Sequence, residues 1–223
     1  MTIKPILFNT EMVRAILDER KAATRRVVKG AKSEWRYEGL SDDAAVMAVD
    51  RNGMEYAKPV DGLWATFEGD DGPIDFPMVK APYCPGDILY VRETWRLVDF
   101  DCIDTDWSAS VQYKADMAKG ERWHDLSPDE RIGWRPSIHM PREAARIWLR
   151  VTDVRVERLQ EIECIATEGI TMIPADNDRD PRFYFIQLWD STIKPADRER
   201  YGWAASPWVW VIEFERCEKP EEG

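Results

Sequence analysis

Cysteine and histidine are scarce in this chain, and their spacing excludes the familiar metal and nucleophile motifs. Four cysteines and two histidines occur in 223 residues, namely Cys84, Cys102, Cys164, Cys217, His124 and His139. No two cysteines form a Cys-x-x-Cys pair, so the spacing does not predict a zinc site. Neither histidine lies in a motif typical of Ser/His/Asp catalysis. We therefore expect free thiols in a reducing compartment, with no metal and no cofactor.

Long apolar runs are also missing from the sequence. No stretch approaches the roughly 20 apolar residues of a membrane-spanning helix, and the first residues lack the apolar core of a signal peptide. We therefore expect a cytoplasmic protein that has no membrane partner.

Positive charge is outnumbered in this chain. The sequence has 31 lysines and arginines against 42 aspartates and glutamates, which gives a formal net charge of −11. A protein that binds long nucleic acid without sequence preference needs many contacts from Lys or Arg to phosphates, so the charge disfavours that class. A nucleoside, a nucleotide or a short nucleic-acid contact in a locally basic cleft stays compatible with it.

The composition otherwise indicates a globular protein. Hydrophobic residues make up 44% and charged residues 33% of the chain, and a chain of this length forms one large or two small domains. Eleven tryptophans are present. Because tryptophan combines a large apolar area with one polar N–H, we expect many of these side chains at a core edge or in a pocket.

Alternating and helical patterns predict a mixed fold. Strands are expected at residues 6–8, 24–28, 45–49, 63–67, 88–91, 111–114, 147–156 and 208–214, and short helices at 12–17, 159–167 and 183–189. Asn9 or Thr10 is placed to cap the first helix. The alternation slips in phase at Thr152 and Asp153, which predicts a bulge in one long strand. This set of elements favours an α+β fold with a closed or nearly closed β-barrel.

A basic cluster with one hydroxyl group follows the first predicted helix. It comprises Arg20, Lys21, Thr24, Arg25 and Arg26. By itself such a cluster is typical of a solvated helix end, where cations stabilise the helix dipole. It also has the parts of a nucleophilic site, because a threonine hydroxyl attacks an acyl carbon when a desolvated lysine takes its proton. Lys21 and Thr24 meet only if Lys21 lies in a turn, since residues three apart on a strand face opposite ways.

Several segments together resemble the ASCH superfamily. They are the basic cluster at residues 20–26, a Pro-Gly-Asp strand at 85–91, a strand and helix at 154–169 and the closing strand at 208–214, together with residues 91–95 and 134–141, which match larger members found in phages and prophages. Residues 29–80 and 97–130 fall outside the resemblance and are predicted to be insertions.

The resemblance implies both a fold and an activity. The fold is a single PUA-like mixed β-barrel over residues 1–217, with short flanking helices, inserted hairpins and a flexible tail at 218–223. Small bacterial members are amidohydrolases that convert N4-acetylcytidine and water to cytidine and acetate. The positions that match their catalytic set are Lys21, Thr24 and Glu168. The implied substrate is a free N4-acylated nucleoside or base, and a PUA-like barrel also has RNA as a possible partner.

The division of labour within this predicted catalytic set stays open. Thr24 is the expected nucleophile, and Glu168 either protonates the leaving amine or activates the water that releases the acyl group. Lys21 acts as a base if it is neutral. If it is an ammonium, it stabilises the oxyanion and Glu168 is the base.

Five further residues are predicted to bind the substrate. Arg26 is favoured over Arg25 because it matches the family's arginine and the two face opposite sides of a strand. Arg92 and Glu93 leave the middle strand near the expected barrel mouth, although Glu93 is equally compatible with a structural ion pair. Trp95 and Trp134 stack on a pyrimidine in one interpretation and fill the core in the other.

Two other functions compete with the enzyme hypothesis. One is a PUA-like module that binds RNA or a modified base without chemistry. The other is a ribonuclease of the ASCH type that uses the same basic cleft. A broad basic stripe outside the cleft would favour either of them.

Overall fold

The computed structural model describes residues 2–49, 54–70, 76–97, 111–117, 133–162, 168–169 and 181–221. Within these ranges strands predominate and the helices are short, so the fold is α+β, as the sequence predicted. No helix in the described ranges has the length and apolarity needed to cross a bilayer.

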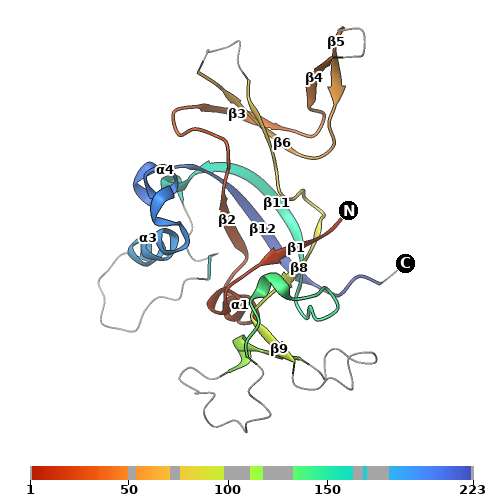
Figure 1. Cartoon of the computed structure of the whole chain (residues 1–223), viewed down its shortest axis with the longest axis vertical. Coiled ribbons are helices and arrows are strands. Elements are labelled where there is room, and N and C mark those ends of the chain that lie inside the picture. Colours follow the sequence, from red (N-terminus) through yellow and green to blue (C-terminus); the bar gives the residue numbers. More distant parts are fainter. Residues whose placement is uncertain are drawn as a thin grey trace.

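A five-stranded sheet forms the centre of the molecule (Figure 1). Its spatial order is β1 (Ile3–Leu7), β8 (Ile88–Arg92), β11 (Trp148–Arg158), β12 (Trp208–Cys217) and β2 (Ala23–Val27). The β1–β8 pair is parallel, and the other pairs are antiparallel. Strands β8, β11 and β12, which carry the apolar runs and alternation, coincide with strands that the sequence predicted. Strands β1 and β2 form the two edges of the sheet.

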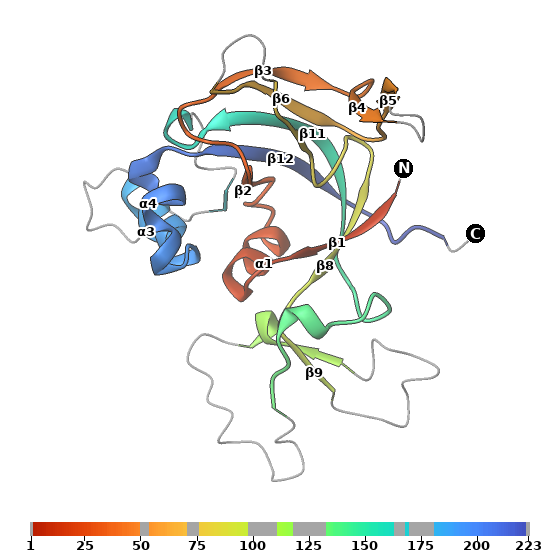
Figure 2. The same cartoon turned by 45° about the horizontal axis from the view of Figure 1, so that its top comes forward.

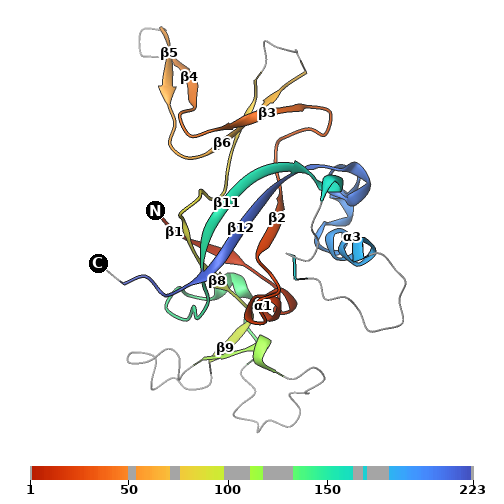
Figure 3. The ribbon, with the colours of Figure 1, turned by 180° about the vertical axis from the view of Figure 1, so that it is seen from behind.

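The long strand β11 carries the predicted bulge. Its register with β12 shifts between Val151 and Asp153, which is where the apolar alternation changes phase. The two strands curve together through this point (Figure 3). A bulge increases local twist and bend, so this irregularity gives the sheet its curvature.

Helix α1 (Thr10–Leu17) lies inside that curve (Figure 2). The Asn9 side chain accepts a hydrogen bond of 2.8 Å from the Met12 N–H, which confirms the expected cap. Val13 and Ile16 are fully buried in the main core. The helix is thereby fixed so that its C-terminal end delivers the chain to β2.

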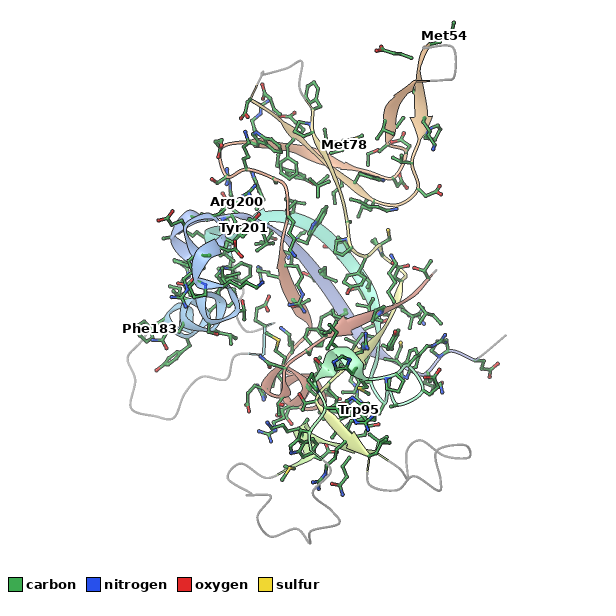
Figure 4. The ribbon with its side chains drawn as sticks, viewed as in Figure 1. Met54, Met78, Trp95, Phe183, Arg200 and Tyr201 are labelled. Carbon is green, nitrogen blue, oxygen red and sulfur yellow. The ribbon has the colours of Figure 1, made fainter. Side chains whose placement is uncertain are left out.

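The described residues between 29 and 80 contain five strands, of which β3 (Arg36–Ser41) and β6 (Trp64–Glu68) contact the central sheet. A three-stranded sheet has the order β3, β6 and β7 (Met78–Lys80), and a hairpin joins β4 (Ala45–Val49) to β5 (Glu55–Pro59). The aromatic rings of β3 and β6 contact Trp208 of β12. The hairpin projects away from the sheet, with Met54 at its far end (Figure 4). The expectation of hairpins here is confirmed.

A second small unit lies next to β8. Strand β9 (Trp95–Leu97) pairs with β10 (Val111–Tyr113), and Trp95 forms an isolated bridge with Arg135. The predicted strand near residue 111 is confirmed, while most of the insertion expected at 97–130 lies outside the described residues.

Helix α3 (Pro181–Thr192) packs against the C-terminal strand β12. Phe185 and Trp189 of α3 pack with Val209 and Val211 of β12, which confirms the helix predicted at 183–189. The short helix α4 (Arg198–Tyr201) follows it. The helix expected at 159–167 is wrong over its described part, because Leu159–Glu161 form a single 3₁₀ turn that ends at Ile162.

Candidate functional site

The chain turns sharply between α1 and β2, and Lys21 lies in that turn. The backbone N–H groups of Arg20 and Lys21 both donate to the Ala15 carbonyl, at 2.8 and 3.0 Å. Glu19 takes a positive φ of 58° to make the reversal. Lys21 then forms an isolated antiparallel bridge with Glu168. The chain therefore reverses directly before Lys21, and Lys21 itself pairs with Glu168.

Gly169 allows the distant Glu168 segment to approach this turn. Its φ is +72°, and a Cβ atom there would lie 2.6 Å from the Cβ of Ala15 and 2.8 Å from that of Lys21. Real Cβ atoms do not approach that closely, so only glycine fits this backbone. In the sequence, this close approach is indicated only by the glycine that directly follows Glu168.

Lys21 and Glu168 form a buried ion pair. The Lys21 Nζ lies 2.9 Å from the Glu168 Oε2, and the two side chains are 0% and 6% exposed. Nζ also donates to the backbone carbonyls of Glu168 at 3.1 Å and Ala23 at 2.7 Å. These acceptors match the three protons of an ammonium group.

Two opposing effects act on the Lys21 ammonium. Burial lowers the pKa of Lys21 below its ordinary value, and the Glu168 carboxylate opposes this shift. The positive charges of Arg26 and Arg25 lower the pKa further. Burial thus favours the neutral amine, while the local hydrogen bonds favour the ammonium.

Thr24 lies close by in the chain, but its hydroxyl is not part of this network. The residue is 2% exposed and pairs with Ile212 in the β2–β12 ladder. Among the described residues, the Thr24 hydroxyl makes no hydrogen bond to Lys21 or Glu168. The structure therefore brings Lys21 and Glu168 together and leaves Thr24 uncoupled from both.

Arg25 rather than Arg26 contacts the Glu168 carboxylate. The Arg25 Nη1 lies 2.6 Å from the Glu168 Oε1, and its Nη2 lies 3.3 Å from the Glu157 Oε2. The family resemblance, not the strand pattern, favoured Arg26. Glu168 lies beside the turn before β2 and reaches the strand face that Arg25 occupies. This contact of Arg25 was not predicted, and the expected role of Arg26 in binding the substrate stays a prediction.

Arg26 approaches the cluster from the opposite face of β2. Its Nη2 donates to the Leu7 carbonyl at 2.9 Å, which ties edge strand β2 to edge strand β1. Its guanidinium carbon lies 5.7 Å from the centre of the Phe8 ring, and the Lys21 Nζ lies 5.8 Å from the same ring. Burial lowers the pKa of Arg26, and Tyr83 and Glu168 oppose that shift.

Glu93 is a structural ion-pair partner. It is 1% exposed, and its two carboxylate oxygens accept hydrogen bonds of 3.0 and 3.1 Å from Arg146. Arg146 also pairs with Asp116 at 2.8 Å. Burial raises the pKa of Glu93, and Arg146 opposes the shift. Of the two interpretations of Glu93, this geometry supports the structural one. Arg92 donates to the Ile138 carbonyl in the neighbouring loop.

The two tryptophans predicted to stack on a base are already covered. Trp95, the first residue of β9, is 2% exposed, and the Arg135 guanidinium lies 5.2 Å from its ring (Figure 4). Trp134 is half-buried, with the Arg96 guanidinium 4.9 Å from its ring. Their contacts support core and loop packing rather than an open stacking platform.

A pocket of about 230 Å³ reaches Glu168 from the side of α1 and α3. It is lined by Asn9, Glu11, Met12, Ala15, Arg20, Glu168, Gly169, Tyr184 and Leu188. Tyr184 and Leu188 were not expected at this site, because the pattern of α3 alone does not show which element the helix packs against.

The described residues contain no group of three or more His, Cys, Asp or Glu side chains placed to hold a metal ion. No protein-family model matches the chain, and no curated protein or solved structure is significantly similar to it. The geometry of the cluster therefore carries the functional argument.

Proposed function

We propose that this protein is an amidohydrolase that removes the acyl group from N4-acylated cytosine or cytidine, and that its curved sheet belongs to a PUA-like barrel of the ASCH type. The observation that carries the proposal is the buried Lys21–Glu168 pair. Residues 147 positions apart converge beside the strand that holds Thr24. A buried ion pair contributes little net stability, and ionisable groups with perturbed pKa values cluster at functional sites.

The chemistry assigns one role to each of three side chains. The Thr24 hydroxyl attacks the acyl carbon, and its proton passes to the Lys21–Glu168 pair as the new ester bond forms. The C–N bond then breaks, and the same pair returns the proton to the N4 amine of cytosine. Water, activated by the same pair, hydrolyses the ester and releases the carboxylic acid.

The contacts of Lys21 favour one version of this scheme. Three acceptors surround its Nζ, which suits an ammonium rather than a neutral base, so Glu168 serves as the base and Lys21 stabilises the oxyanion by exchanging one of these acceptors for it. The proposal requires the substrate to bring the Thr24 hydroxyl into hydrogen-bond contact with this pair. Catalytic hydrogen bonds often form only in the substrate complex.

The pocket at Glu168 supports a small substrate. Its volume of about 230 Å³ lies below the roughly 300–1,000 Å³ typical of drug-sized ligands. The net charge of −11 also disfavours a polyanion. A free nucleoside or base fits both observations better than a polymer does.

The direct test is incubation with N4-acetylcytidine followed by chromatography for cytidine. Wild type should release cytidine, while Lys21→Ala, Thr24→Val and Glu168→Gln should each lose roughly 100-fold or more in kcat. Thr66→Val, on β6, is the matched control for Thr24→Val and should keep full activity. Absence of cytidine from every N4-acyl analogue would refute the proposal, and full activity of Thr24→Val would refute the nucleophile.

One observation favours a binding module as the second candidate. The Lys21 ammonium is saturated with acceptors, and no hydrogen bond joins it to the Thr24 hydroxyl within the described part of the chain. A non-catalytic PUA-like domain that binds RNA or a modified base would have this geometry. Salt-dependent retardation of RNA without any turnover would support it.

A further inference from the structure

A chain of alternating charges connects the buried lysine to the surface. Lys21 contacts Glu168 at 2.9 Å, Glu168 contacts Arg25 at 2.6 Å, and Arg25 contacts Glu157 at 3.3 Å. Glu157 then contacts Arg155 at 2.5 Å. The side-chain exposure of Lys21, Arg25, Glu157 and Arg155 rises from 0% to 4%, 24% and 38%. Charge of alternating sign thus runs outward from the candidate site.

Arg25 is the link on which this chain depends. Its Nη1 and Nη2 atoms go to two different carboxylates, while its buried Nε has no hydrogen-bond partner among the described residues. The two carboxylates therefore set the position of the guanidinium. Glu157 is itself held by Arg155, which also pairs with Asp153 at 2.8 Å and Glu213 at 2.6 Å.

The energetics argue that stability alone does not account for this arrangement. Desolvating several charges costs free energy that their mutual attraction only partly offsets, and well-packed apolar side chains often do as well or better. Apolar side chains already pack on this side of β12, at Val209 and Val211. A buried arginine between two carboxylates therefore points to control of geometry at Glu168.

We propose that Arg25, clamped by Glu157, is a positioning residue that fixes the rotation of the Glu168 carboxylate, so that one oxygen faces Arg25 and the other faces Lys21. The inference rests on the proposed amide-cleaving function. It assigns Arg25 no contact with the substrate. Without the clamp, the carboxylate is free to rotate away from the lysine and from the proton it must transfer.

Arg25 also affects the charge of Lys21. Among the described residues, the ionised groups that bear on Lys21 are Glu168, Arg25 and Arg26, and Phe8 supplies an aromatic ring beside it. The positive charge of Arg25 disfavours a second positive charge on Lys21 and so lowers its pKa. Removing that charge in Arg25→Gln should raise the pKa of Lys21, which moves the titration of the ammonium to higher pH.

The test compares Arg25→Gln and Glu157→Gln with wild type in two ways. NMR of ¹⁵N-labelled lysine ammonium groups follows the titration of Lys21, whose signal is identified by its loss in Lys21→Arg. Steady-state kinetics against pH on N4-acetylcytidine follow kcat and KM. We expect a higher midpoint for Lys21 in Arg25→Gln and a loss in kcat of about 10- to 100-fold in both variants, with KM nearly unchanged.

Two further variants make the test specific. Arg150→Gln removes the same charge from the same strand as Glu157 but from an exposed pair with Glu215, and it should leave both readouts at wild-type values. Arg25→Lys keeps the charge but not the two-pronged geometry, so it should restore the Lys21 midpoint without restoring kcat. If Arg25→Gln fails to fold, the kcat of Glu157→Gln, a change at a partly exposed residue, is compared with that of wild type and of Arg150→Gln instead.

The outcomes separate this inference from the proposed function. An active enzyme in which Arg25→Gln and Glu157→Gln behave like Arg150→Gln in both readouts overturns the inference and leaves the function standing. A wild-type protein that turns over no N4-acyl substrate overturns the function. In that case an unchanged Lys21 midpoint in Arg25→Gln overturns the coupling between the two groups as well, whereas a raised midpoint supports it.

Discussion

Gly169 holds the two halves of the candidate site together. It combines a positive φ with an approach to Ala15 and Lys21 that leaves no room for a Cβ atom. We predict that Gly169→Ala lowers the free energy of unfolding by about 2–4 kcal/mol, from the left-handed backbone and the overlap together. Urea unfolding followed by tryptophan fluorescence measures the change.

The matched control for this change is Gly86→Ala. Gly86 also has a positive φ, of +86°, but an added Cβ there would meet nothing within 4 Å. It should therefore show only the backbone strain, of about 1–2 kcal/mol. Equal effects in the two variants would contradict the close-approach argument.

The Glu93–Arg146 pair gives a second prediction at this scale. Glu93→Gln removes the charge that neutralises a partly buried arginine, and we expect a loss of roughly 2–3 kcal/mol in unfolding free energy. Arg146 keeps its contact with Asp116, which limits the loss. Thermal unfolding measures it. A stable Glu93→Gln protein that has lost turnover would instead make Glu93 a site residue.

Individual residues were predictable where backbone geometry limits the choices. A turn at Lys21 was expected only as the condition for a contact with Thr24, and Lys21 contacts Ala23 and Glu168 instead. Glu168 was found through the resemblance. The Arg25 contact was not found, because its partner arrives from a segment nearly 150 residues away and no local pattern specifies that approach. The role of Glu93 stayed open because the sequence is equally compatible with a structural ion pair and with a residue that binds substrate in a cleft.

At the scale of elements, helix α1 positions the turn that carries Lys21. Its first turn depends on the Asn9 side chain, which accepts from the Met12 N–H. Asn9→Ala should cost about 1 kcal/mol of stability, whereas Asn9→Asp should keep most of it because aspartate caps equally well. Chemical denaturation of both variants checks this, and an equal loss in the two would show that the cap hydrogen bond is not the cause.

Elements were predictable in proportion to how much of their pattern is local. The bulge in β11 was visible as a phase slip because Leu149 and Val151 before it and Val154 and Val156 after it all pack into the same core. Strands β3, β5, β7 and β9 were not predicted individually, since each is short and its pairing is decided by the neighbouring strand. Of the helix expected at 159–167, the described part is a 3₁₀ turn at Leu159–Glu161, and Leu159 and Ile162 are buried beside α3.

At the scale of the whole molecule, Asp87 ties the start of the chain to the sheet. Its carboxylate accepts hydrogen bonds from Lys4, from the hydroxyl and backbone N–H of Thr2, and from the Cys84 N–H. Burial alone would raise its pKa, but these hydrogen bonds outweigh burial and hold the pKa at about 2.

This shift predicts acid sensitivity with a defined window. Because the folded pKa of Asp87 lies below the unfolded value of about 4, its stabilisation is complete above pH 4 and is lost as the pH falls towards 2. We expect a loss of roughly 1–2 kcal/mol over this range, after screening by solvent. Unfolding measured at pH 5, 4, 3 and 2 should show a flatter profile in Asp87→Asn than in wild type or in the exposed control Asp61→Asn.

The order of strands in the central sheet has a consequence for how fast the protein reaches its native state. Strand β2 pairs with β12 and β1 pairs with β8, so the sheet joins segments from opposite parts of the chain. Pairing of distant segments costs loop-closure entropy before the new contacts stabilise the chain. Proteins dominated by such pairing fold in milliseconds to seconds. During synthesis, the apolar side chains of β1 and α1 emerge from the ribosome long before β12 can cover them, which makes the early chain a natural client for chaperones.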